Sequence, residues 1–266
     1  MLSTLTLSIS AVAALVPAAL LPYRRDATRD ALFWMLLAVA FAGPAVWIWT
    51  AFAPGWRTGL ASALWIIVTA SLFLFAILAA VLRDVWRLAP LLFPYLVVIG
   101  ILATIWLQQP ERPLSAEAPG AWVQFHIAVS VLTYALLTIG AIAGFAVMLQ
   151  ERALKLKRPG GLTRMLPSVA DGERIQVGLL AAGAAILGCD LASGMAAQFF
   201  QSGQLIEITH KTALSLLTFA IIVVLLAVHA RTGIRGRRAA RYVLAAYLLI
   251  TLAYPGVKFV TDVVLS

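Results

Sequence analysis

The chain has 266 residues, of which 62% are hydrophobic and only 12% are charged, and its formal net charge is +9. Soluble domains carry about 25% charged residues, so this composition excludes a soluble enzyme and predicts an integral membrane protein. The positive charge does not require a nucleic-acid partner, because basic loops beside a membrane are attracted to anionic lipid. The single cysteine, Cys189, excludes a disulfide within the chain and a CxxC redox pair.

Eight stretches are apolar over the length of about 20 residues that a membrane-spanning helix needs. In chain order they cover residues 2–22, 31–52, 60–82, 88–107, 123–148, 175–199, 211–230 and 242–265. The first stretch is interpreted as a transmembrane helix and not as a signal peptide, because basic residues follow it and none precedes it. We therefore expect an all-α bundle of about eight transmembrane helices without a soluble domain.

The basic residues predict how this bundle is oriented. Most of the 20 Lys and Arg residues lie in the connections that follow the first, third, fifth and seventh spans. The positive-inside rule places these connections in the cytoplasm. We therefore expect a multi-pass protein of the bacterial inner (plasma) membrane with both termini on the outer, periplasmic side. His126 and His210 then lie at the outer ends of the fifth and seventh spans, and His229 lies at the inner end of the seventh.

The fifth span carries small and polar residues on one helical face. His126, Ser130, Thr133, Gly140 and Gly144 share this face at helical spacing. Small and polar residues within a membrane pack against other helices, so His126 is expected to face protein. An alternative interpretation is a plain packing seam, in which the two hydroxyls bond back to the preceding turn.

The seventh span has a similar stripe, formed by Lys211, Ser215, Thr218 and His229. His229 is a candidate site residue, or else an interfacial residue that complements the negative C-terminal end of its helix. His210 is likewise either a site residue or a solvated loop residue.

Asp190 in the sixth span and Lys258 in the eighth are charged residues inside predicted membrane helices. Counting about 1.5 Å of rise per residue places them at comparable depth below the outer surface. A carboxylate in hydrocarbon usually has a partner, so we expect an intramembrane pair of Asp190 and Lys258. This pair is either a structural clamp or part of a proton or substrate site.

Several motifs of the chain together point to one family. They are the runs FHIAVSVLTYALLTIGAIAG (125–144) and VHARTGIRGRRAARYVLAAYLLITLAYPGVKFV (228–260), with ASG at 192–194 and HKT at 210–212. They resemble the cytochrome c assembly proteins of the CcsA/CcmC/HemX superfamily, most of all its short YpjD-type inner-membrane branch. The resemblance covers residues 60–266. We therefore expect two N-terminal transmembrane helices in residues 1–59 and a cytochrome c assembly-like domain in residues 60–266.

The resemblance implies a protein that binds haem or moves it across the membrane in cytochrome c biogenesis. His126 matches the position of the family's first outer haem-ligand histidine, and His229 matches a histidine within the membrane. The implied cofactor is haem b, bound through His126. His210 does not lie at the family's position for a second histidine, and we consider it as a hypothetical second imidazole for the iron. The implied partners are haem, membrane lipid and other cytochrome c maturation proteins.

The chain departs from the family at its haem-presenting surface. The family's tryptophan-rich, WWD-containing segment would fall at residues 195–211, which read MAAQFFQSGQLIEITHK and contain no tryptophan. We therefore expect a protein that handles haem without performing the ligation chemistry, and so not an enzyme.

Two other functions remain open at this point. One is a non-catalytic membrane accessory protein of the same fold without haem ligation, acting through partners or on ion and metal tolerance. The other is a small-solute or proton-coupled transporter that uses Asp190, Lys258 and the histidines. The transporter ranks last because the chain shows no inverted repeat and no pair of broken half-helices.

Overall fold

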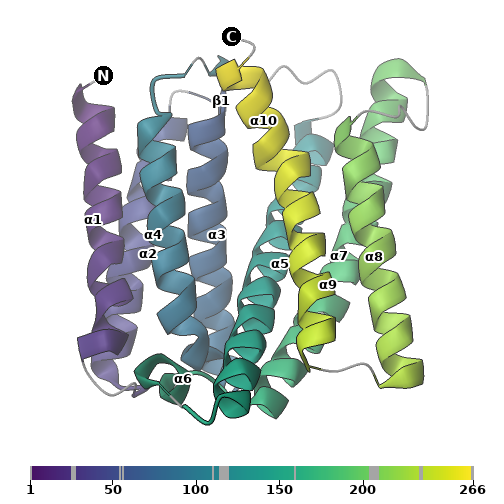
Figure 1. The fold of residues 1–266 in the computed structure, drawn as a ribbon. Helices are drawn as coiled ribbons and strands as arrows, with labels where there is room; N and C mark the ends of the chain where they lie inside the picture. The colour runs from purple at the N-terminus through teal and green to yellow at the C-terminus, as the bar shows by residue number, and fades with distance from the viewer. Residues whose placement is uncertain are drawn as a thin grey trace.

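Eight helical stretches of the structure are long and apolar enough to cross a membrane, which confirms the predicted all-α bundle (Figure 1). The structure is a computed structural model that describes residues 2–24, 28–53, 55, 57–109, 111–113, 120–158, 160–203, 210–233 and 236–264. The long helices are α1 (Leu2–Arg24), α2 (Ala31–Phe52), α3 (Leu60–Val81), α4 (Ala89–Ile105), α5 (Gly120–Lys155), α7 (Val169–Ser202), α8 (His210–Thr232) and α9 (Gly236–Thr251). Both termini lie at one end of the bundle, which we call the terminal end (Figure 1).

Short elements connect or extend the long helices. They are β1 (Arg57–Thr58), η1 (Val85–Leu88), β2 (Arg112–Pro113), α6 (Gly161–Met165), η2 (Leu252–Gly256), α10 (Val257–Phe259) and η3 (Val260–Val264). β1 and β2 form an antiparallel pair in which Arg57 lies opposite Pro113. This pair joins the connection between α2 and α3 to the one between α4 and α5.

Helices α5 and α7 extend well beyond the apolar stretches that predicted them. α5 continues to Lys155 instead of ending at 148, and α7 begins at Val169 instead of 175. Hydropathy marks only the part of a helix that lies in hydrocarbon, whereas backbone hydrogen bonds continue into polar sequence. At the start of α7 the side chain of Ser168 caps the helix, accepting a hydrogen bond of 3.2 Å from Asp171 N.

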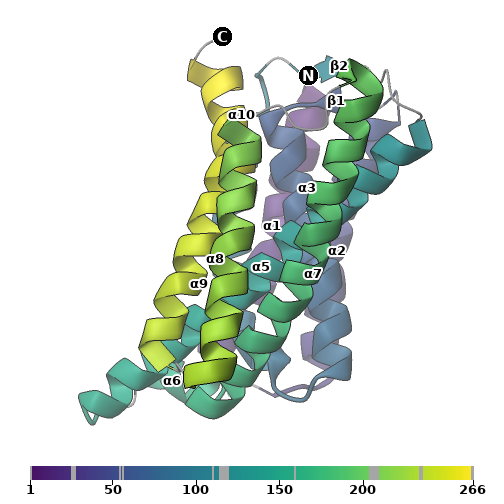
Figure 2. The same cartoon turned by 90° about the vertical axis from the view of Figure 1, so that its right-hand side faces the viewer.

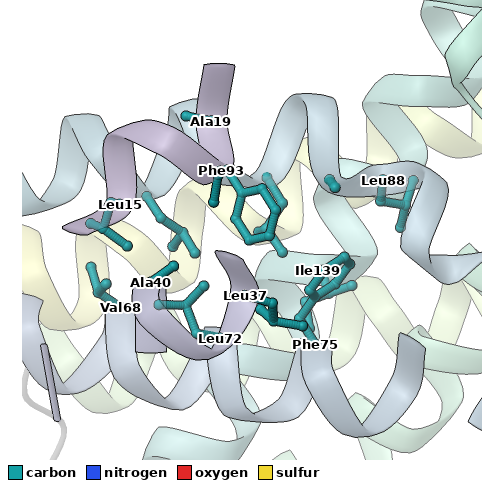
Figure 3. Close-up of a cluster of buried hydrophobic side chains, with 14 of the residues drawn as sticks. Leu15, Ala19, Leu37, Ala40, Val68, Leu72, Phe75, Leu88, Phe93 and Ile139 are labelled. Carbon is teal, nitrogen blue, oxygen red and sulfur yellow. The ribbon is translucent and has the colours of Figure 1, made fainter. Parts of the chain in front are cut away.

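Helix α5 lies between the two hydrophobic clusters of the bundle. One cluster joins the four helices α1, α2, α3 and α4 to one side of α5. Leu15, Leu72, Phe93 and Ile139 are among its members (Figure 3). The other joins the opposite side of α5 to α7, α8 and α9. Because both clusters pack on it, α5 buries 78% of its most apolar stretch, compared with 17% for α8. α5 is therefore the central helix of the fold.

Helix α9 is anchored where it begins, at the end opposite the termini. The amide of Gly236 donates to Glu173 of α7, and the amide of Arg237 donates to Glu151 of α5 over 3.1 Å. The φ angle of Gly236 is +65°, and a Cβ there would overlap the Glu151 carboxylate. Glycine thus permits both the backbone conformation and the approach of the acid, which also complements the positive end of the α9 dipole.

Beyond Thr251, the last span does not continue as a regular α-helix. The π-helical turn η2 contains Pro255, which has no amide hydrogen for an ordinary helical bond. A π turn accommodates such a break while the chain keeps its helical direction. It places Tyr254 at the wall of a cavity described below.

We predict that Gly43→Ala destabilises the packing of α1 against α2. A Cβ at Gly43 would lie 2.8 Å from Ala14 Cβ and 3.2 Å from Ala11 Cα, so one helix must shift, at a cost of ~1–3 kcal/mol. Gly178→Ala in α7 is the control, because a Cβ there meets nothing within 4 Å. The measurement is the midpoint of thermal unfolding in detergent. Equal midpoints for the two variants would contradict the close contact.

Candidate functional site

His126 lies near the start of α5, close to the terminal end, and its imidazole points at α7. The ring nitrogen Nδ1 lies 2.9 Å from Ser193 Oγ and 3.2 Å from Asp190 Oδ1. The Ser193 hydroxyl donates to the backbone oxygen of Asp190 over 2.9 Å, so its lone pairs accept from the histidine. Nδ1 therefore carries a hydrogen that it donates to Ser193 Oγ, and the same nitrogen lies at ion-pair distance from Asp190 Oδ1. The imidazole is 25% exposed.

Asp190 connects this histidine to a second residue of α5. Ser130 donates a short hydrogen bond to Asp190 Oδ1, the same oxygen that faces His126. The Trp122 indole donates to the backbone oxygen of Ser193 over 3.1 Å, one turn closer to the terminal end. α5 and α7 are thus joined by several polar contacts, and Asp190, which is 16% exposed, has the partners that a carboxylate in a membrane requires.

Gly194 provides the space in which the His126 ring lies. A Cβ at Gly194 would lie 3.1 Å from Cε1 of His126, which is closer than side chains normally approach. The ASG sequence of residues 192–194 therefore serves the histidine twice. Ser193 accepts the hydrogen of Nδ1, and Gly194 leaves room for the ring.

A cavity of about 180 Å³ opens beside this histidine, between α5, α7 and α8. Its walls are His126, Asp190, Leu191, Gly194, Met195, Gln198, Thr212, Ser215 and Leu216. A smaller cavity of about 40 Å³ lies behind Asp190 and is also bordered by Ser130, Thr133 and Tyr254. Within the described part of the chain, the buried Oγ1 of Thr133 has no hydrogen-bond partner. This polar atom makes the small cavity suitable for a water molecule.

Deeper in the bundle, three tyrosines from different helices form a hydroxyl chain. Tyr134 of α5 lies 3.0 Å from Thr251 Oγ1 and accepts from Tyr247 over 3.4 Å. The hydroxyls of Tyr247 and Tyr95 are 2.5 Å apart. Thr138 also donates to the Tyr247 hydroxyl over 3.0 Å. Polar side chains thus continue from the His126 site into the middle of the bundle.

The structure separates the predicted site residues into two groups. His126 and Asp190 lie together, and the predicted stripe of α5 does face α7, because Gly140 approaches Leu179 and Gly144 approaches Gln176. His210 begins α8 close to Thr212, a wall residue of the larger cavity, but its side chain lies outside the described residues. His229 lies near the other end of α8, about 28 Å along the axis from His210.

The ion pair between Asp190 and Lys258 stays a prediction. What the structure adds is the contact of Asp190 with His126, which the sequence did not suggest. Tyr95 and Tyr247 were also missed, and Ser193 was singled out only as part of the ASG motif of the family resemblance. A serine next to a helix glycine and tyrosines within apolar runs were the available signals, but neither indicates which helix the side chain meets.

Comparison with known proteins finds one matching family. A family model described as cytochrome C assembly protein matches residues 30–265. An uncharacterized 28.8 kDa protein of Azospirillum brasilense, in a nifR3-like 5′ region, is 53% identical over 264 residues, covering 97% of each chain. The inner membrane protein YpjD of Escherichia coli K12 is 28% identical over 180 residues, which cover 67% of this chain and 66% of the relative.

We predict that Gly194→Ala displaces the His126 ring and weakens its contacts with Ser193 and Asp190. The control is Gly188→Ala in the same helix, where a Cβ would meet only Phe219 at 3.5 Å, an ordinary contact. The measurement is ¹⁵N NMR of histidine-labelled protein in detergent micelles. The resonance of the hydrogen-bonded Nδ1 is expected to shift in Gly194→Ala alone. An unchanged resonance would contradict the tight placement of the ring.

Proposed function

The chain belongs to the cytochrome c assembly protein family, and on this premise we propose that it handles haem, binding or moving it during cytochrome c biogenesis. The observation that carries the proposal is the fixed imidazole of His126. Its Nδ1 donates to Ser193 and lies 3.2 Å from the Asp190 carboxylate at the edge of a cavity. Histidines that ligate metals almost always donate their other ring nitrogen to a carboxylate, a carbonyl or water in this way.

The hydrogen on Nδ1 determines which atom of His126 meets the iron. In the neutral imidazole, a hydrogen on Nδ1 leaves the lone pair on Nε2. Nε2 is thus the ligand atom in our proposal, while Asp190 keeps the ring in one orientation and raises its basicity. The bound haem would supply an iron centre whose redox potential depends on these axial ligands and their surroundings.

The volume of the cavity limits how much of a haem b molecule it can hold. Typical ligand pockets measure roughly 300–1,000 Å³, and the cavity beside His126 measures about 180 Å³. It could therefore not enclose the whole macrocycle, and His126 would hold haem through a contact at the edge of the cavity. His210, which begins α8 beside this mouth, is proposed as the second iron ligand. His229 is proposed as a separate haem contact at the opposite end of α8.

The proposed location is the bacterial inner membrane, with the His126 site on the outer side. This placement rests on the basic connections, which collect at the end opposite the termini and favour the cytoplasm. Other cytochrome c maturation proteins are the proposed partners that deliver or accept haem. The ligation reaction itself is not assigned to this chain, because residues 195–211 contain no tryptophan.

The test is the haem absorption spectrum of the purified protein and of single histidine variants. Wild type is expected to show a Soret band, either as purified or after addition of hemin. His126→Ala should lose most of this band, and imidazole added to the buffer should partly restore it. His210→Ala should change the ligation state, and His229→Ala should leave the outer site intact. A colourless protein that gains no band with hemin would contradict the proposal and favour a non-catalytic accessory role.

A further variant separates an effect on iron ligation from an effect on folding. Asp190→Asn keeps the size of the side chain but removes its charge, so His126 remains and loses its anionic partner. Loss of such a partner weakens metal binding by roughly 10–100-fold, and we expect hemin affinity to fall by about tenfold. Ser168→Ala, which removes the cap of α7 and a hydrogen bond to the Asp171 carboxylate, is the control. Equal hemin affinities for Asp190→Asn and wild type would show that the carboxylate does not support an iron ligand.

A further inference from the structure

A membrane-facing groove runs between α8 and α9, away from the His126 site. These two helices lie next to each other at the edge of the bundle (Figures 1 and 2). The groove has a volume of about 320 Å³. It is lined by Ala220, Ile221, Val224, Leu225, Val228 and Tyr242. The groove is open to the outside, since Val224 is 60% and Tyr242 54% exposed.

The length and depth of the groove match one leaflet of a bilayer. Ala220 lies near the middle of α8, and Val228 lies one turn before the helix ends at Thr232. The distance from Ala220 to Val228 along the axis is about 12 Å. The hydrocarbon of one leaflet is about 15 Å thick, half of the bilayer core. The groove is therefore long enough to hold most of the part of an acyl chain that lies between one interface and the bilayer midplane.

Two arginines lie at the interface end of the groove. Arg231 follows the lining residue Val228 by three positions on α8, and Arg238 precedes the lining residue Tyr242 by four positions on α9. Residues three or four apart lie on the same helical face, so both arginines continue the groove towards the headgroups. Both are exposed. The nearby acids Glu151 and Glu173 accept hydrogen bonds from the first amides of α9.

We propose that this groove is a binding site for an anionic phospholipid. One acyl chain lies against the aliphatic side chains of α8, and the phosphate lies between Arg231 and Arg238, whose guanidinium groups can donate to it bidentately. Charge complementarity favours an anionic over a zwitterionic headgroup. The six lining side chains include no histidine, cysteine or methionine to ligate haem iron. The site would also compensate for the low burial of α8, in which only 17% of the most apolar stretch is buried.

The test is a lipid titration of the detergent-solubilised protein by native mass spectrometry. Phosphatidylglycerol and phosphatidylcholine with identical acyl chains are compared on wild type, Arg231→Gln/Arg238→Gln and the control Arg83→Gln/Arg158→Gln. The control removes two exposed arginines that follow α3 and α5. One arginine near the membrane surface strengthens the binding of an anionic lipid about fivefold. We therefore expect wild type to prefer phosphatidylglycerol at least tenfold, the groove variant to lose this preference and the control to keep it.

A third variant tests the groove apart from its charges. Ala220→Phe places a large ring at the midplane end, where the acyl chain would lie, and keeps both arginines. It is expected to weaken the binding of both lipids at least fivefold, with circular dichroism showing an intact fold. Equal binding of the two lipids by wild type would overturn the proposal, as would equal losses in the two double variants. A Soret band with hemin that Ala220→Phe abolishes would instead make the groove a haem site.

Discussion

Helix α5 packs against α7 over most of its length, and the positions of the other helices depend on this contact. In lipid, the burial of apolar surface does not drive helices to associate. Their association depends instead on the close packing of small residues and on buried polar contacts. Gly140 and Gly144 of α5 lie against Leu179 and Gln176, and Gly172 of α7 lies against Val147. At the end opposite the termini, the Gln150 amide donates to the backbone oxygen of Thr163 in α6 over 2.7 Å.

The same contact explains why a histidine and an aspartate are tolerated in the membrane. His126, Ser130, Asp190 and Ser193 satisfy one another across the α5–α7 interface, so none of them depends on water for its main partner. Each group is also held in one orientation. A fixed imidazole is a better metal ligand than a mobile one, because less side-chain freedom is lost on binding. The contacts that join α5 to α7 would therefore also support the proposed iron ligand.

Helix α8 differs from α5 in almost every respect. It packs mainly against its sequence neighbours α7 and α9 and buries only 17% of its most apolar stretch. Its first turns complete the cavity beside His126, and its last turns form the apolar groove with α9. The two proposed sites thus use opposite ends of the least buried span. Lipid in the groove would supply packing there that the protein itself does not provide.

The sequence by itself determined the membrane location, the eight spans, the face of α5 that meets protein and the family. These features are local, since hydropathy and helical periodicity depend only on neighbours along the chain. The ends of α5 and α7 were misjudged because helices continue beyond the hydrocarbon. Only the tertiary structure placed Asp190 beside His126 and Tyr95 beside Tyr247. Such pairings depend on the rotation and depth of one helix relative to another, which packing sets and which no pattern within a single span encodes.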